Sequence, residues 1–275
     1  MAGILVAAAL AAASPAVAPA AAEMESASPA IFVVRDADTT VYLFGTFHAL
    51  DGRSGWFNDR VRNAFEQSDE LVLETLVPER TAAGAPVPQP LRSLSVTSSA
   101  SFLASTRMAI NAGRSHGMQV GNGADMVLRH AAEAEGKPVE GLETLESQLN
   151  MFTRMPATPA VAPRRVDAPA MDTLSKSMVE MQDAWKRGDQ AVFVRMLGQL
   201  ERSSPDTYRM MFTERNGRWA DWIRARMQTP GTVFVAVGAG HLAGKDSVLV
   251  RLAQLGIRSA RVYLPPELAF PPRLH

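Results

Sequence analysis

The 275-residue sequence has no cysteine, only four lysines and no excess of either charge. The absence of cysteine excludes disulfides, a thiolate nucleophile, cysteine-ligated zinc and iron–sulfur clusters. Any bound metal must therefore be held by histidine, carboxylate or amide groups. With 28 basic and 28 acidic residues, the chain has no electrostatic reason to bind nucleic acid or an anionic membrane. We expect no nucleic-acid partner.

A long apolar run is also missing, and the amino terminus carries only a short one. Residues 3–13, GILVAAALAAA, are too few for a membrane span of about 20 residues, so no transmembrane anchor is predicted. The run suits the apolar part of a secretory signal, and Ala20, Ala21 and Ala22 supply small residues for cleavage. We expect a signal peptide over residues 1–22, a flexible lead-in over 23–29, and a periplasmic or secreted protein. A disordered Ala/Pro-rich tail is the alternative.

The rest of the chain has the composition of a soluble globular domain. Hydrophobic residues make up 47% of the sequence and charged residues 20%, which is enough apolar material for a sizeable core. The expected strands are the β-rich runs 31–35, 40–46, 70–74, 232–237 and 257–264. A helix capped by Asn58 and a helix over 246–255 lie between them. We predict an α/β fold with a mixed central sheet and flanking helices, as a single domain over residues 30–275.

The middle of the chain is predicted to be a helical insertion over about 100–205. One segment has an amphipathic stripe, which is more typical of core packing than of a cofactor site. Its members are Met171, Leu174, Met178, Met181 and Trp185. Residues 78–101 are rich in Pro, Ala and Ser and are predicted to form a loop. Asp206 is predicted to cap a long helix that ends near Met227.

Three residues with metal-ligand or acid–base chemistry follow predicted strands. His48 and His241 each end a Gly-x-x-His sequence, and Glu74 ends the strand 70–74. Ligands of α/β proteins bind beyond the carboxyl ends of the strands. Two neutral imidazoles and a carboxylate suffice to hold a catalytic divalent metal with open positions for water. The alternative is that each histidine is only a hydrogen-bonded residue at a strand end, but three such ends together favour a site.

Arg215 and Asn216 lie on the apolar face of the predicted helix 206–227, between Phe212 and Trp219. A charged side chain directed at the core is costly unless it is paired or serves a site. Arg215 could bind a substrate carboxylate or an oxyanion, and Asn216 could orient a ligand. A structural pair of Arg215 with Glu214 or with a buried carboxylate is an equal alternative.

The motifs around these residues resemble TraB/GumN family proteins and occur in the family's order. They are YLFGTFH at 42–48, LVLE at 71–74, GLETLESQL at 141–149, AWKRGD at 184–189, ERN..W at 214–219 and VAVGAGHLAGKDSVLVRLAQLGI at 235–257. The family is similar to the Tiki metal-dependent proteases and, more distantly, to erythromycin esterases and ChaN-like haem-binding proteins. The resemblance implies an α/β fold with a helical insertion, and an active site that uses His48, Glu74, Arg215, Asn216 and His241.

The leading hypothesis is a metal-dependent hydrolase, most simply a peptidase, with His48, Glu74 and His241 as metal ligands. The ion would be Mn²⁺, Co²⁺ or Zn²⁺, because a His/carboxylate set does not select among them. Glu74 could be a ligand or the general base. One alternative is metal-free, esterase-like hydrolysis with His48 as base. Another is a non-catalytic periplasmic binding protein for a peptide, haem or metal. The expected partner is a peptide or small-molecule substrate, and the sequence carries no signal of an oligomeric state.

Overall fold

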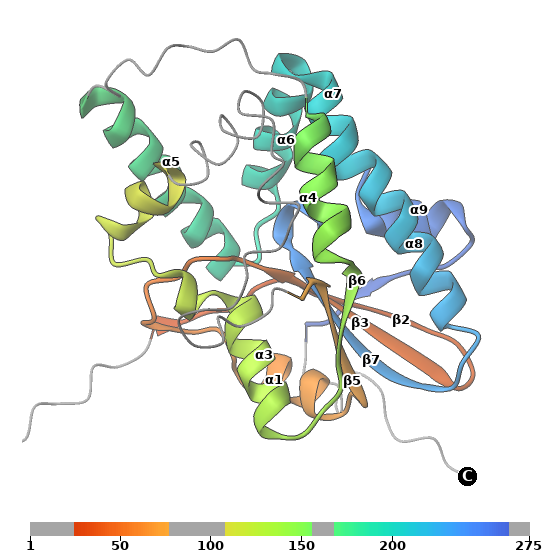
Figure 1. Ribbon diagram of the computed structural model, residues 1–275. Coiled ribbons are helices and arrows are strands. Elements are labelled where there is room, and N and C mark those ends of the chain that lie inside the picture. Colours follow the sequence, from red (N-terminus) through yellow and green to blue (C-terminus); the bar gives the residue numbers. More distant parts are fainter. Residues whose placement is uncertain (1–24, 77–107, 156–167, 264–275) are drawn as a thin grey trace, which may run out of the picture.

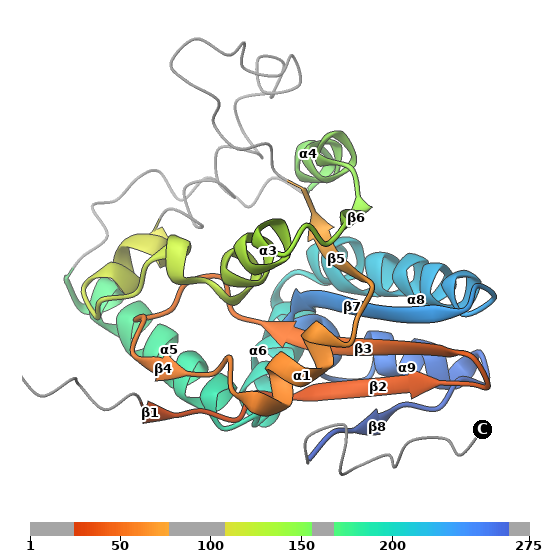
Figure 2. The ribbon, with the colours of Figure 1, turned by 90° about the horizontal axis from the view of Figure 1, so that it is seen from below.

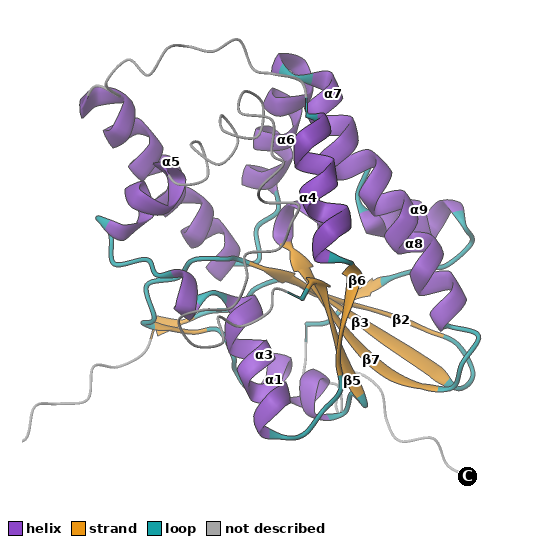
Figure 3. Ribbon diagram, viewed as in Figure 1, coloured by secondary structure: helices purple, strands orange, loops and turns teal. Residues whose placement is uncertain are grey.

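A six-stranded mixed sheet forms the centre of the computed structural model, which describes residues 25–76, 108–155 and 168–263 (Figures 1 and 3). The strand order is β6-β5-β7-β3-β2-β8. The first four strands in this order are mutually parallel, whereas β2 is antiparallel to both of its neighbours. The strands are β2 (Ile31–Arg35), β3 (Thr39–Thr46), β5 (Glu70–Thr75), β6 (Val139–Glu143), β7 (Gly231–Gly238) and β8 (Ala260–Arg261). The predicted α/β fold with a mixed central sheet is confirmed.

The two faces of the sheet are both apolar and are covered by different helices (Figures 1 and 2). Side chains alternate between the faces along a strand, so Tyr42 and Phe44 of β3 belong to one cluster and Val41 and Leu43 to the other. Helices α1 (Asp59–Glu66) and α3 (Ala124–Ala134) pack on the first face. Helices α8 (Glu214–Arg226) and α9 (Val248–Gln254) pack on the second. The result is a three-layer α/β/α domain.

Local signals at the amino-terminal end behave as predicted. The turn between β2 and β3 is closed by Asp36, whose carboxylate accepts a 2.9 Å hydrogen bond from the backbone N–H of Thr39. Asn58 caps α1, because its side-chain oxygen accepts hydrogen bonds from the backbone N–H groups of Arg60 and Val61. The hairpin, helix and strand therefore form the opening unit of the sheet.

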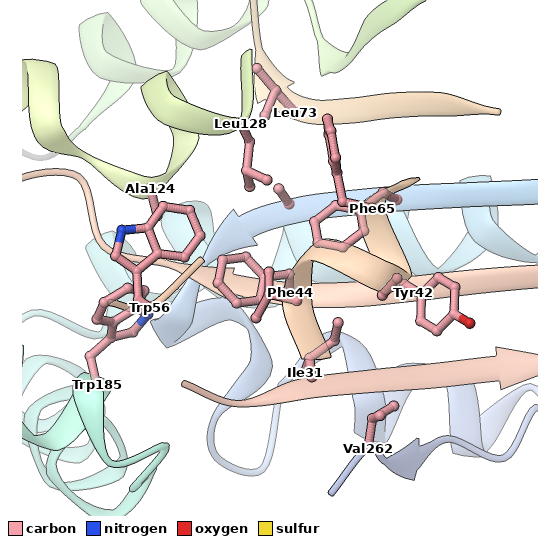
Figure 4. Close-up of a cluster of buried hydrophobic side chains, with 14 of the residues drawn as sticks. Ile31, Tyr42, Phe44, Trp56, Phe65, Leu73, Ala124, Leu128, Trp185 and Val262 are labelled. Atoms are coloured by element: carbon pink, nitrogen blue, oxygen red, sulfur yellow. The ribbon is translucent and has the colours of Figure 1, made fainter. Parts of the chain in front are cut away.

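Helices from the middle of the chain lie over the carboxyl edge of the parallel strands (Figure 1). They are α4 (Leu145–Arg154), α5 (Ala168–Lys186) and α6 (Ala191–Ser203), and residues 108–114 are also helical. Trp185 fixes the end of α5 to the sheet, because its indole N–H donates a 2.7 Å hydrogen bond to the carbonyl of Gly45. Its ring packs against Phe44 and Trp56 in the aromatic part of the core (Figure 4).

The long helix predicted over 206–227 consists of three consecutive helical segments. It begins with α7 (Pro205–Tyr208), continues as a π-helical segment (Arg209–Thr213) and ends as α8. Asp206 is therefore inside the first turn and not the cap, which is Ser204. A π turn adds a residue to the helical repeat, and single-sequence periodicity does not reveal it.

Two strands differ from the predictions. Strand β6 lies inside the range predicted as a helical insertion, where two glutamates and a glycine gave no strand pattern. The last strand is shorter than 257–264, since only Ala260–Arg261 pair with β2. Within the predicted lead-in over 23–29, β1 (Glu25–Ser26) pairs with β4 (Ser54–Gly55), and Ala27 is buried.

Two predicted segments, the signal peptide over 1–22 and the loop over 78–101, lie outside the described residues. Within the part of the chain that the structure describes, no helix is long and apolar enough to cross a membrane.

Candidate active site

Each of the four parallel strands carries an ionisable side chain at or just beyond its carboxyl end. His48 follows β3, Glu74 and Glu143 lie at the ends of β5 and β6, and His241 follows β7. The strands are hydrogen-bonded neighbours, with Thr75 paired to Glu143 and Thr46 paired to Gly238. The four side chains therefore lie along one edge of the sheet.

Gly238 marks the point where three of these side chains meet. A methyl group on this residue would lie 3.2 Å from Glu74 Oε1, 3.4 Å from His48 Nε2 and 3.7 Å from His241 Cδ2. The backbone N–H of Gly238 also donates a 2.7 Å hydrogen bond to Glu74 Oε1. Only glycine leaves this space open, so the first Gly-x-x-His glycine of the β7 end serves the site directly.

His241 is buried and held in one orientation. Its Nδ1 lies 2.6 Å from Asn216 Oδ1, and the amide nitrogen of Asn216 donates to the carbonyl of Asp246, which orients the amide. In this network Nδ1 carries the proton, and Nε2 faces Glu74 Oε1 at 3.7 Å. Burial, opposed by the charge of Glu74, lowers the pKa of His241 to about 3, so the ring is neutral at physiological pH.

Arg215 joins the sheet edge to helix α8 through two carboxylates. Its side chain is 3% exposed; Nη2 donates to Glu74 Oε2 at 2.9 Å, and Nε lies 3.0 Å from Glu143 Oε2. The guanidinium also stacks over the Trp219 ring at 4.5 Å. Arg215 therefore pairs with buried carboxylates and not with Glu214, which pairs with Arg209. Because its Nη1 is 3.4 Å from His241 Nε2, the pair belongs to the same cluster as the histidine.

Glu74 is held ionised by its neighbours. Burial raises the pKa of its carboxyl, but the His241 ring, which is charged only in acid, the charges of Arg215 and His48 and the hydrogen bond from the Gly238 N–H outweigh burial and lower the pKa to about 2. The carboxylate thus presents one oxygen to Gly238 and the other to Arg215.

His48 has a different environment from His241. Its side chain is 61% exposed, and Nδ1 lies 3.2 Å from Asp125 Oδ1 in the first turn of α3. Surrounding protein disfavours the charged ring, but the Asp125 carboxylate and, secondarily, Glu74 outweigh this and raise the pKa of His48 to about 9. The α3 turn approaches closely because Gly123 has no side chain; a Cβ there would collide with the carbonyl oxygen of His48.

The cluster forms the floor of a cleft of about 500 Å³. His48, Glu74, Arg215 and His241 line the floor together with the backbone from 238 to 240. The walls come from the helices above the sheet edge and from the π-helical segment, which contributes Met211 and Phe212. Mean pocket sizes for small ligands are about 300–1,000 Å³, so the cleft suits a ligand.

The π-helical segment lies directly before the buried pair Arg215 and Asn216. Its Phe212 ring packs on one side of His241 at 4.8 Å, and Trp219 of α8 packs at 4.5 Å. A π turn shifts the residues on either side of it relative to one another, and such turns concentrate at functional sites. The π-helical segment thus allows the Phe212 ring, the Arg215 guanidinium and the Asn216 amide to reach the same cluster.

The donor chemistry of His48, Glu74 and His241 fits a divalent metal ion. Each imidazole has Nδ1 next to a side-chain oxygen, of Asp125 or Asn216, as is typical of metal-ligating histidines, and this leaves Nε2 for the ion. The 3.7 Å between His241 Nε2 and Glu74 Oε1 is close to the roughly 3.3–3.6 Å between ligand atoms in a tetrahedral shell. Among the described residues, no three His, Asp or Glu side chains form a complete ligand group as they stand.

Sequence reasoning placed five residues in the site and missed Glu143 and Asp125. Glu143 was missed because β6 was not predicted, although its GLET motif was among the quoted segments. Asp125 lies in the first turn of α3, where an acidic residue has an ordinary explanation at a helix amino terminus. Two other histidines, His116 and His130, are exposed and do not line the cleft.

Comparison with known proteins supplies the family. No curated protein and no solved structure matched the chain. A model of the TraB/PrgY/gumN family matches residues 30–91 and 89–261, which include all of the residues in the cluster. The chain therefore belongs to the TraB/PrgY/gumN family.

Proposed function

We propose that this protein is an exported metal-dependent hydrolase that cleaves peptide bonds. The observation that carries the proposal is the meeting of His48, Glu74 and His241 around Gly238, on the floor of a cleft large enough for a ligand. A divalent ion held by these three side chains would lower the pKa of a bound water and polarise the scissile carbonyl. The short apolar run before Ala22 supports export.

The other groups of the cluster have supporting roles in this proposal. Asn216 holds His241 in the tautomer that presents Nε2, and Asp125 does the same for His48. Arg215 lines the cleft with an Nη1 whose contact to His241 is long, at 3.4 Å. A guanidinium in this position can stabilise an oxyanion that develops on the substrate. Glu74 remains either a ligand or the base that accepts the proton of water.

A second candidate is metal-free hydrolysis with His48 as general base. The observation that favours it is the Asp125 carboxylate behind Nδ1, since a base oriented by a carboxylate is the usual arrangement in nucleophilic hydrolases. We rank the metal-dependent reaction first because three side chains with ligand chemistry, His48, Glu74 and His241, meet around Gly238, whereas the metal-free reaction uses only His48 as base.

The test is turnover of a fluorogenic peptide library by protein dialysed against chelator and then supplied with Mn²⁺, Co²⁺ or Zn²⁺. We expect cleavage to depend on the added ion and to be abolished in His48→Ala, His241→Ala and Glu74→Gln. Asn216→Ala, which removes a partner of a ligand and not the ligand itself, should lose about 10–100-fold. His116→Ala is the matched control, because this histidine is exposed and outside the cleft.

The outcomes separate the candidates. Cleavage at full rate after dialysis, lost in His48→Ala only, would support the metal-free reaction. Retention of a peptide, haem or metal without turnover under any condition would contradict both hydrolase candidates and support a binding protein.

A further inference from the structure

The walls of the cleft are almost entirely apolar, in contrast to its floor. Methionine and phenylalanine predominate among its large residues, and the methionines are Met178 and Met181 of α5, Met196 of α6 and Met211 of the π-helical segment. Phe152 of α4 completes this part of the wall. Of the described residues that line the cleft, the ionisable ones are those of the floor. The part of the wall that the structure describes therefore offers mainly van der Waals surface, with the Gln148 amide and no charged side chain.

Part of this apolar surface is open to solvent. Among the lining residues, Met196 is 38% exposed and Val120 is 43% exposed. Large apolar side chains that gather in a concave site and remain accessible mark a binding surface, because burying them against a ligand is favourable. The amphipathic stripe predicted along α5 therefore divides between the core and the cleft. Trp185 packs into the core, whereas Met178 and Met181 line the cleft.

The charges of the floor are balanced within the protein. Arg215 is paired with Glu74 and Glu143, Arg218 is also paired with Glu143, and His48 is paired with Asp125. A charged group of a ligand would find no unpaired counter-charge on these residues, and its desolvation in an apolar cleft would be costly. The cleft therefore favours a neutral, apolar occupant.

We infer that the cleft selects peptide segments with large apolar side chains, such as Leu, Met or Phe. These side chains would flank the peptide bond that lies over the floor of the cleft. Methionine is unbranched and polarisable, so a methionine-lined wall adapts to several apolar shapes. Selection is consequently expected for apolarity and size, not for one side chain. The inference rests on the proposed function for the identity of the ligand as a peptide, but the preference itself is a property of binding.

The experiment measures peptide binding by the full chain with fluorescence anisotropy. Three blocked, labelled octapeptides differ only at two central positions, which are Leu-Phe, Ser-Ser or Lys-Lys. We expect the Leu-Phe peptide to bind at least about tenfold more tightly than either of the others, since each added apolar group in such a pocket is worth roughly 10-fold or more. Equal affinity for all three peptides would overturn the inference.

Variants locate the binding in the cleft. Met196→Lys should weaken binding of the Leu-Phe peptide by about tenfold, and Met196→Leu should retain it. Val194→Lys is the matched control, because Val194 is 44% exposed on the same helix and does not line the cleft. Both lysine substitutions are at exposed positions, so folding is preserved. Equal binding by the two lysine variants would contradict the inference.

Turnover in the same samples separates this inference from the proposed function. Selective binding of the Leu-Phe peptide without metal-stimulated cleavage would support apolar selection and contradict the hydrolase. Metal-stimulated cleavage at equal rates for the three peptides would support the hydrolase and contradict apolar selection.

Discussion

The floor and the wall of the cleft are built on opposite principles. The floor is polar, and its members hold one another: Arg215 is 3% exposed between Glu74 and Glu143, and His241 is fixed by Asn216. The wall is apolar, half-exposed and made of flexible side chains such as Met181 and Met196. Chemistry requires atoms at fixed positions, whereas recognition of varied apolar groups tolerates movement. We therefore expect substitutions in the floor to lower the free energy of unfolding more than substitutions in the wall.

The largest effect is expected from Arg215→Ala. The variant leaves the largely buried Glu74 without its arginine, while Glu143 keeps only the half-exposed Arg218, and breaking a buried pair in this way costs about 3–5 kcal/mol. Urea unfolding at neutral pH measures the free energy of unfolding. Arg209→Ala is the control: its partners Asp206 and Glu214 are exposed, so a loss of at most about 1 kcal/mol is expected. Equal losses in the two variants would show that the floor is not a tightly coupled unit.

An intermediate effect is expected where the wall joins the floor. Asp51, in the loop after β3, accepts hydrogen bonds from Lys186 at 3.0 Å and Gln182 at 3.2 Å on α5. Burial raises the pKa of Asp51, but the N–H of Arg53 and these partners outweigh burial and lower it. Asp51→Asn should lower the free energy of unfolding at pH 7 by about 1.5–3 kcal/mol, since the lost hydrogen bonds are to a charged group.

The pH dependence of this joint has a definite sign. A depressed carboxyl pKa stabilises the folded state above the ordinary value of 3.8, and the contribution is lost as the pH falls below it. Between pH 5 and pH 3, the free energy of unfolding should therefore decrease less in Asp51→Asn than in the wild type. Asp172→Asn, which removes an exposed pair with Lys176, should follow the wild type. If the free energy of unfolding of Asp51→Asn decreased in acid as much as that of the wild type, Asp51 would not be the source of this pH dependence.

The smallest effect is expected from Met178→Leu in the wall. The two side chains have similar volumes, and such exchanges usually cost less than about 1.5 kcal/mol even in a core. Because Met178 is only half-buried, both stability and peptide turnover should stay near the wild type. Urea unfolding and the peptide assay check this. A loss as large as that of Arg215→Ala would mean that the wall is as rigidly specified as the floor.

The parts of the fold with strong local signals were predictable. The buried β7 run, the β2–β3 hairpin and the Asn58 cap each depend on residues close together in the sequence. The two Gly-x-x-His ends were informative only together with Glu74, because a single histidine at a strand end has an ordinary structural explanation. The structure brings their side chains and Glu74 to one position, while the roles of these residues stay a prediction.

The rest depended on information that is not local. Strand β6 forms only because β5 offers an edge with which it pairs in parallel, and its sequence alone carries two charges and a glycine. Without β6, the position of Glu143 opposite Arg215 could not be inferred. The π-helical segment likewise accompanies contacts of Phe212 and Trp219 with His241, which comes from a separate part of the chain. Periodicity in one segment cannot report such contacts.

The central claim is that His48, Glu74 and His241 hold one metal ion, and titration calorimetry tests it most directly. Chelator-treated protein is titrated with Mn²⁺ and with Zn²⁺, alongside His48→Ala, Glu74→Gln, His241→Ala and the control His116→Ala. The account predicts one ion per chain in the wild type and the control, with affinity lost in each of the other three variants. Undiminished binding in all three variants, or no binding of either ion by the wild type, would contradict it.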